Sequence, residues 1–254
     1  MKILAIIPSR YGSTRFPGKP LVKIDGKTMI QRVYERSSLA LEHVCVATDD
    51  QRIFDEVIRF GGDVVMTSSC HKSGTDRCFE AMNIVEKRDT KQYDIIVNIQ
   101  GDEPFISPEQ LLELIACFFN DSGTKIATLV KRFSPEEDIF NPNCPKVVIS
   151  KEFYALYFSR NAIPFQRGAD LKDWNGNMPY YKHIGLYAFT RDTLVAISKL
   201  KPAFLEMAEQ LEQLRWLEYG YRVKVAITQH SSYSIDTHDD IDNLISKNII
   251  KSSV

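Results

Sequence analysis

The sequence predicts an α/β protein with a mixed, mainly parallel sheet and flanking helices. Short apolar runs alternate with amphipathic stretches, which is the pattern of parallel strands joined by crossover helices. The clearest run spans residues 94–100 and holds Ile95, Ile96 and Val97 in sequence, as a strand buried on both faces requires. With 254 residues and no internal repeat or long linker, residues 1–254 are expected to form a single domain.

The first half of the chain alternates regularly between strands and helices. The expected strands are residues 3–7, 44–48, 64–67 and 94–100. The expected helices are residues 28–41, 51–60 and 75–88, and one that starts near residue 108. Gly61 and Gly62 give a strong helix stop. Ser107 is a helix cap, Pro108 suits the first helical position, and Gln110 completes a capping box.

The second half has a less regular order. The expected strands are residues 125–131, 146–149, 153–159, 182–189, 221–228 and 234–236. A long helix is expected over 203–219, a polar excursion over 168–179, and a last helix capped by Thr237 and Asp240. We interpret residues 130–190 as a sub-region inserted in the domain.

Composition excludes several classes of protein. The 32 Lys and Arg balance the 33 Asp and Glu, so no basic field for nucleic acid exists. No apolar run approaches the ~20 residues of a membrane span, and the first run is stopped by Pro8, too soon for a signal peptide. The five cysteines form no C-x-x-C pair, which indicates reduced thiols. We expect a cytoplasmic protein with no nucleic-acid or membrane partner.

The loop after the first strand carries the strongest functional signal. Gly12 and Gly18 allow backbone N–H groups to approach an anion, and the loop holds Arg10, Ser13 and Lys19. Its glycine spacing and the proline after Lys19 match neither a Walker A motif nor G-x-G-x-x-G. A loop at the carboxyl end of a strand in an open α/β sheet is a ligand site, and these groups suit a triphosphate.

Two carboxylates follow other expected strands. Asp102 lies in a Gly-Asp-Glu turn after the central strand, and Asp236 lies between a short strand and a helix cap. Together they predict a Mg²⁺ site shared with the triphosphate, since Mg²⁺ favours one or two carboxylates completed by water and phosphate. Taken singly, each also fits a turn or a capping carboxylate.

Polar residues elsewhere fit a base, a ribose or a sugar. Ser73, Gly74 and Thr75 open an expected helix and offer N–H and hydroxyl groups, although N-capping by Thr75 explains them nearly as well. Arg160 suits a carboxylate. The candidates for sugar hydroxyls are His183, Tyr187, Glu212 and Gln213, of which the last two also fit a solvated helix face. Zinc-type spacing and G-x-S-x-G are absent from the sequence.

These stretches, in this order, resemble the 3-deoxy-manno-octulosonate (Kdo) cytidylyltransferases from end to end. The matching stretches are Ile7-Pro-Ser-Arg10-Tyr-Gly-Ser13-Thr-Arg-Phe-Pro-Gly-Lys19-Pro-Leu21, Val46-Ala-Thr-Asp49, His71-Lys-Ser-Gly-Thr-Asp-Arg77, Val97-Asn-Ile-Gln-Gly-Asp-Glu-Pro104, Tyr154-Ala-Leu-Tyr-Phe-Ser-Arg160, His183-Ile-Gly-Leu-Tyr187 and Leu211-Glu-Gln-Leu-Arg215. Two positions depart from the family pattern: Ser9 stands where the family has Ala, and His238 where it has Pro.

The resemblance implies a nucleotide-diphospho-sugar transferase fold, Mg²⁺ dependence and a homodimer, with the inserted sub-region serving dimerisation and sugar binding. It implies transfer of CMP from CTP to the anomeric hydroxyl of Kdo for lipopolysaccharide synthesis. The implied CTP ligands are Arg10, Ser13, Lys19, Ser73, Gly74, Thr75 and Gln100. The implied metal ligands are Asp102 and Asp236, which with Arg10 and Lys19 make up the catalytic set. The implied sugar ligands are Arg160, His183, Tyr187, Glu212 and Gln213.

Three other functions remain open on the sequence. One is a cytidylyltransferase for a related acidic sugar, such as 8-amino-Kdo or a sialic-type acid. Another is an inactive nucleotide-sensing homologue, which would not need both metal carboxylates. A nucleotide-sugar glycosyltransferase is the third, although Thr48-Asp49-Asp50 is a poor D-x-D motif.

Overall fold

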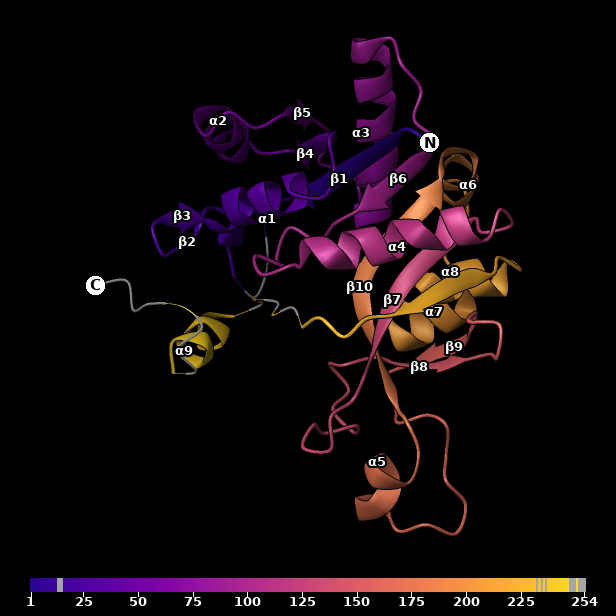
Figure 1. The fold of residues 1–254 in the computed structure, drawn as a ribbon. Coiled ribbons are helices and arrows are strands. Elements are labelled where there is room, and N and C mark those ends of the chain that lie inside the picture. Colours follow the sequence, from indigo (N-terminus) through magenta and orange to yellow (C-terminus); the bar gives the residue numbers. More distant parts are fainter. Residues whose placement is uncertain (13–15, 232, 234, 236, 247–249, 251–254) are drawn as a thin grey trace. The chain divides into compact units, whose positions relative to one another are not determined.

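A computed structural model describes residues 1–12, 16–231, 233, 235, 237–246 and 250. Ser13 and Asp236 therefore lie outside the described residues. The chain divides into two compact units, one of residues 1–112 with 231–254 and one of residues 113–230. The expected sub-region 130–190 lies within the second unit. Figure 1 shows the course of the chain.

The first unit contains a parallel sheet in the order β6-β1-β4-β5. Its strands are β1 (Ile3–Ser9), β4 (Val44–Thr48), β5 (Val64–Met66) and β6 (Ile95–Asn98). The helices α1 (Met29–Ser38), α2 (Gln51–Arg59) and α3 (Gly74–Asp89) pack against these strands. Every residue of β4 and β6 is buried, as the apolar runs predict for parallel strands covered on both faces.

Smaller elements complete the first unit. After β1 come the 3₁₀ helix η1 (Lys19–Leu21) and a hairpin of β2 (Lys23–Ile24) and β3 (Lys27–Thr28). The helix α9 (His238–Ser246) contributes Leu244 to a buried cluster with Ile24 and Met29. Thr237 and Asp240 exchange hydrogen bonds at its start, so the expected capping box is confirmed.

The second unit contains a mixed sheet. The strands β7 (Ile126–Arg132) and β11 (Val223–Ile227) are parallel, and β10 (Tyr181–Thr190) is antiparallel to β7. The strands β8 (Lys146–Ile149) and β9 (Ala155–Ser159) form an antiparallel pair, and β8 also pairs with β10. The register of β10 shifts between Ile184 and Tyr187.

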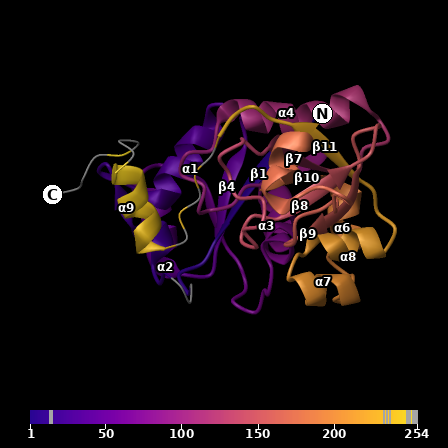
Figure 2. The same ribbon diagram turned by 90° about the horizontal axis from the view of Figure 1, so that it is seen from below.

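The unit boundary falls within α4 (Pro108–Asn120). The side chain of Gln110 accepts a hydrogen bond from Ser107 N, as expected at this helix start. The other helices of the second unit are η2 (Leu171–Asp173), α5 (Trp174–Asn177), α6 (Arg191–Ile197), α7 (Phe204–Glu209) and α8 (Gln213–Glu218). Figure 2 shows α7 and α8 side by side.

The mixed, mostly parallel fold class is confirmed, but the long helix over 203–219 is wrong. Gln210 adopts a left-handed conformation (φ 53°) that ends α7, and a separate helix, α8, begins at Gln213. The helix α6 and the β2–β3 hairpin are additional to the predicted elements. Among the described residues, no helix has both the length and the apolar character that membrane crossing requires.

Candidate functional site

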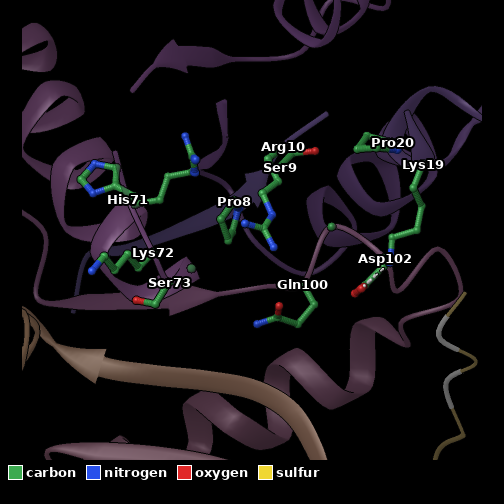
Figure 3. Close-up of a pocket in the computed structure, with 13 residues that line it drawn as sticks. Pro8, Ser9, Arg10, Lys19, Pro20, His71, Lys72, Ser73, Gln100 and Asp102 are labelled. Carbon is green, nitrogen blue, oxygen red and sulfur yellow. Dashed lines mark hydrogen bonds and ion pairs between the residues drawn. The ribbon is translucent and has the colours of Figure 1, made fainter. Parts of the chain in front are cut away.

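A pocket of about 250 Å³ lies in the first unit, where β1, β5 and β6 end. Because parallel strands deliver their following loops to one edge of a sheet, three distant stretches of sequence meet there. The pocket is lined by residues 8–10, 19–20, 71–74, 77 and 100–102. Figure 3 shows Arg10, Lys19, Ser73, Gln100 and Asp102 around this space.

The two charged signals of the sequence meet directly in the pocket. Lys19 Nζ lies 2.8 Å from Asp102 Oδ2, and the Lys19 side chain is only 12% exposed. Arg10 and Lys72 line the same pocket and are cationic too. The site therefore combines several positive charges with one carboxylate, which suits a polyanion that brings a metal ion.

Gly101 permits the close packing of the Asp102 turn against the end of β1. A Cβ added at Gly101 would lie 3.0 Å from the carbonyl oxygen of Pro8. The turn is also held from the other side, because Ile235 N donates to the carbonyl of Asp102. Backbone contacts thus fix the position from which Asp102 reaches the pocket.

Ser73 caps α3 and lines the pocket. Its Oγ accepts a hydrogen bond of 3.1 Å from Asp76 N, so the cap expected at Thr75 is supplied by Ser73 instead. Thr75 is buried inside the first turn and is not among the residues that line the pocket. Gly74 does line it, and an added Cβ there would make only ordinary contacts with Pro8 and Asn98.

Arg77 organises the wall of the pocket, a role that the sequence did not predict. Its side chain is 4% exposed and donates to Asp49 Oδ2 at 2.7 Å and to Thr67 Oγ1 at 2.6 Å. These partners follow the ends of β4 and β5, so one guanidinium ties α3 to two strand ends. His71, also at the pocket, pairs with Glu80 of α3.

A polar cluster lies in the second unit around the register shift of β10. The rings of His183 and Tyr187 are 5.2 Å apart, and His183 Nε2 is 3.0 Å from Thr128 Oγ1. Burial lowers the pKa of His183 to about 3. Burial and the nearby Glu212 carboxylate raise the pKa of Tyr187 well above its usual value. His183 and Tyr187 are therefore neutral at pH 7.

The second unit contains buried polar atoms for which the described residues supply no hydrogen-bond partner. Tyr187 Oη and Gln213 Nε2 are buried and have no hydrogen-bond partner among the described residues. Native proteins seldom leave such atoms unpaired, and each exception calls for a water or a ligand. The structure thus brings the predicted residues His183, Tyr187 and Glu212 together, while contacts of Gln213 with sugar hydroxyls stay a prediction.

Arg160 is held by backbone carbonyls at the end of β9. Its Nε donates to Glu209 O at 2.7 Å, Nη1 to Pro142 O at 3.0 Å, and Nη2 to Gln210 O at 3.2 Å. A guanidinium has five N–H groups, so two remain for another acceptor. A role for Arg160 toward a carboxylate stays a prediction.

The predicted residues thus divide between the units. The pocket of the first unit gathers Arg10, Lys19, Ser73, Gly74, Gln100 and Asp102. The second unit holds Arg160, His183, Tyr187, Glu212 and Gln213. The roles of Ser13 and Asp236 stay predictions, because both residues lie outside the described part of the chain.

Comparisons with known proteins agree on one family. Residues 4–227 match the cytidylyltransferase family. A protein of Parabacteroides distasonis named 3-deoxy-manno-octulosonate cytidylyltransferase is 53% identical over 96% of this chain and 97% of its own length. A protein of the same name from Bacteroides thetaiotaomicron is 55% identical over 95% of this chain and 96% of its own. A solved structure of CMP:2-keto-3-deoxy-manno-octonic acid synthetase complexed with CTP is 38% identical, with a TM-score of 0.88 over 98% of this chain and 99% of its own.

Proposed function

Because the chain belongs to the 3-deoxy-manno-octulosonate cytidylyltransferase family, we propose that it transfers CMP from CTP to Kdo. The anomeric hydroxyl of Kdo attacks the α-phosphorus of CTP, a P–O bond forms, and pyrophosphate leaves. The Lys19–Asp102 pair at the edge of the parallel sheet is the observation that carries this proposal. It puts a cation for the phosphates and a carboxylate for a metal ion in one pocket.

The first unit binds the nucleotide in this proposal. Arg10 and Lys19, with Ser13, hold the triphosphate and stabilise the charge that develops on pyrophosphate. Gln100, Ser73 and Gly74 contact the cytosine and ribose, whereas Thr75 is buried and does not line the pocket. No covalent nucleophile is needed, because positioning and electrostatics suffice for this type of transfer.

Mg²⁺ fits the chemistry of the donors at the pocket. Asp102 offers carboxylate oxygens, the hard ligands that Mg²⁺ prefers, and Asp236 is the proposed second carboxylate. Bound there, Mg²⁺ would neutralise phosphate charge. Lys19 Nζ lies 2.8 Å from the Asp102 carboxylate, so the cation proposed for the phosphates and the carboxylate proposed for Mg²⁺ would act side by side.

The Asp102→Asn variant tests the metal proposal. The amide keeps the shape of the side chain but removes the negative charge, so we expect turnover to lose its response to added Mg²⁺. Initial rates across a Mg²⁺ titration measure this response. A titration curve equal to that of the wild type would exclude Asp102 as the metal ligand.

The second unit binds the acidic sugar. The proposed ligand of the sugar carboxylate is Arg160, and His183, Tyr187, Glu212 and Gln213 contact the sugar hydroxyls. The buried Tyr187 Oη and Gln213 Nε2 support this assignment, since a polyol supplies the hydrogen bonds that the described residues do not.

We place the reaction in the cytoplasm, in lipopolysaccharide biosynthesis, and carried out by a homodimer. All five cysteines are free thiols, which agrees with a reducing compartment. The homodimer is inferred from membership of the family, and the exposed Phe140 and Phe165 of the second unit support it.

Pyrophosphate release with each nucleoside triphosphate, with and without Kdo, tests the function. We expect release only with CTP plus Kdo. Faster release with 8-amino-Kdo or a sialic-type acid would identify a different acidic sugar as the substrate. If no pair releases pyrophosphate although CTP binds, the chain is a nucleotide-binding homologue without catalysis.

A further inference from the structure

Lys146 is fully buried. Among the described residues, every hydrogen bond of its ammonium group goes to a main-chain carbonyl oxygen. Its Nζ donates to the carbonyls of Asn141 at 2.8 Å, Cys144 at 2.9 Å and Arg160 at 2.5 Å. An ammonium group has three N–H donors and a neutral amine has two. The three acceptors therefore match the charged form, and every donor of Lys146 is used.

The same network holds Arg160 from several directions. Lys146 binds the carbonyl of Arg160, and the Glu209 carboxylate accepts from Arg160 N at 2.9 Å and from Ser159 Oγ at 2.7 Å. The Arg160 guanidinium donates to two further carbonyls. One belongs to Pro142, in the 141–144 turn that Lys146 also binds, and the other to Glu209 at the end of α7. The main chain and side chain of Arg160 are thus fixed together.

Burying an unpaired charge is costly, and among the described residues no carboxylate accepts a hydrogen bond from Lys146. A buried apolar side chain of similar length would hold β8 in the sheet without this cost. The ammonium group binds the 141–144 turn and the carbonyl of Arg160 at the same time, so it fixes the distance between them. Two of the five N–H groups of Arg160 make no hydrogen bond to the described residues, so their direction depends on this fixed frame.

We propose that Lys146, together with Glu209, is a positioning residue that orients Arg160 so that its two remaining N–H groups meet the carboxylate of the sugar acid. This proposal rests on the proposed function, in which Arg160 is the carboxylate ligand. A bidentate contact depends on the angle of the guanidinium plane, so a loosened frame weakens binding of the acid even when Arg160 itself is intact.

The Lys146→Met variant separates positioning from a purely structural role. Met matches the lysine side chain as far as Cε, lacks the ammonium group, and so removes the three hydrogen bonds. We expect KM for Kdo to rise about tenfold, with KM for CTP unchanged, at a temperature well below the unfolding midpoint. A purely structural role predicts a lower melting temperature and a smaller active fraction, with KM for Kdo unchanged, and that result would overturn the proposal.

Lys224→Met is the matched control. Lys224 lies in the same unit, and its Nζ binds Asp121 Oδ2 and the Glu152 carbonyl, neither of which belongs to the Arg160 network. This variant loses a partly buried lysine with its hydrogen bonds, yet it should keep the wild-type KM for Kdo. If it raised KM for Kdo as much as Lys146→Met does, the effect would be general destabilisation and the proposal would fail.

A double-mutant cycle with Arg160→Lys shows whether Lys146 acts through Arg160. We expect Arg160→Lys alone to raise KM for Kdo, and Lys146→Met to add less than about twofold in that background. Additive effects would overturn the positioning role. If Arg160→Lys leaves KM for Kdo unchanged, Arg160 is not the ligand of the sugar carboxylate, and the proposed function fails at that residue. This result differs from additive effects, which contradict only the positioning role of Lys146.

If Lys146→Met does not fold, Glu209→Gln gives the same test. The amide of Gln keeps the shape of the side chain. It replaces one carboxylate oxygen by an NH₂ group, which cannot accept, and leaves one uncharged oxygen as a weaker acceptor for Arg160 N or Ser159 Oγ. We expect KM for Kdo to rise and KM for CTP to stay unchanged. An unchanged KM for Kdo would overturn the proposal by this route.

Discussion

Lys19 and Asp102 show how single residues from distant stretches of sequence form a working pair. They are 83 positions apart and meet at 2.8 Å because each follows a strand of one parallel sheet. Their meeting was predictable, since strands of this kind deliver their loops to one edge. The position of Arg77 was not, because its partners Asp49 and Thr67 are 28 and 10 residues away on other elements and nothing local marks the contact.

Lys19→Ala should depress turnover by about a hundredfold, since one preorganised charge contact to the transition state contributes roughly 3 kcal/mol. The fold should persist, because η1 is short and Lys19 lies at a pocket wall. Steady-state kcat and the melting temperature measure the two effects. The exposed neighbour Lys23 provides the control variant Lys23→Ala, and near-normal turnover of Lys19→Ala would contradict the role of the loop.

His183 makes stability depend on pH in a defined window. Its pKa falls from 6.5 to about 3 on folding, because burial disfavours the charged ring. The neutral ring contributes its full share of the unfolding free energy above pH 6.5. Between pH 6.5 and about 3 only the unfolded chain takes up the proton, so this contribution is lost as the pH falls.

We therefore expect His183→Gln to flatten the acid side of the stability profile. Between pH 6.5 and 3 the difference in unfolding free energy between wild type and variant should change by up to about 1.4 kcal/mol per pH unit. Urea unfolding at several pH values measures it. Parallel profiles for the two proteins would show that His183 takes up a proton as readily in the folded protein as in the unfolded chain, and would contradict the lowered pKa.

Among the elements, the helix ends show what sequence reasoning found and what it missed. The caps at Ser107 and Thr237 were readable because each cap and its partner lie three residues apart. The break of the expected helix 203–219 was not, since Gln210 is an ordinary helix former, and its carbonyl, at φ 53°, accepts a hydrogen bond from the distant Arg160. The β2–β3 hairpin had a readable signal: Asp25 and Gly26 have φ of 46° and 81°, as a type I′ Asp-Gly turn requires.

Thr90 ends α3 in a left-handed conformation that is unfavourable for a β-branched residue. Its φ of 52° and ψ of 40° suit glycine, the usual residue at this place. We expect Thr90→Gly to stabilise the protein by about 0.5–1 kcal/mol, after allowing for the greater freedom of glycine in the unfolded chain. Chemical denaturation measures the gain. Thr90→Ala keeps a Cβ and is the control, so an equal gain in both variants would show that backbone strain is not the cause.

At the scale of the whole molecule, the second unit exposes aromatic side chains around a small core. Phe165 is 74% exposed and Phe140 43% exposed, and both pack against the buried Trp174 with ring centroids 5.0 and 5.7 Å away. Large exposed apolar side chains that gather around one buried residue suggest an interaction site. This region lies within residues 130–190, the stretch for which the family resemblance implies a role in dimerisation.

We expect the protein to have twice the chain mass of 29.1 kDa in solution. Phe165→Asp should shift it toward the monomer, because a buried unpaired carboxylate disfavours association. Light scattering after size exclusion measures both masses. Leu39, which is 75% exposed in the first unit, gives the control Leu39→Asp. A wild-type monomer, or equal dissociation of both variants, would contradict this interface.

The tight turn at Gly101 limits how the site can change in evolution or in the laboratory. Any side chain there would press on the carbonyl of Pro8, which belongs to a sheet strand and moves only with it. A saturation library selected for activity should therefore return glycine at position 101, whereas position 74 should also accept alanine. New substrate preferences should then arise from substitutions around this turn, with glycine kept at position 101.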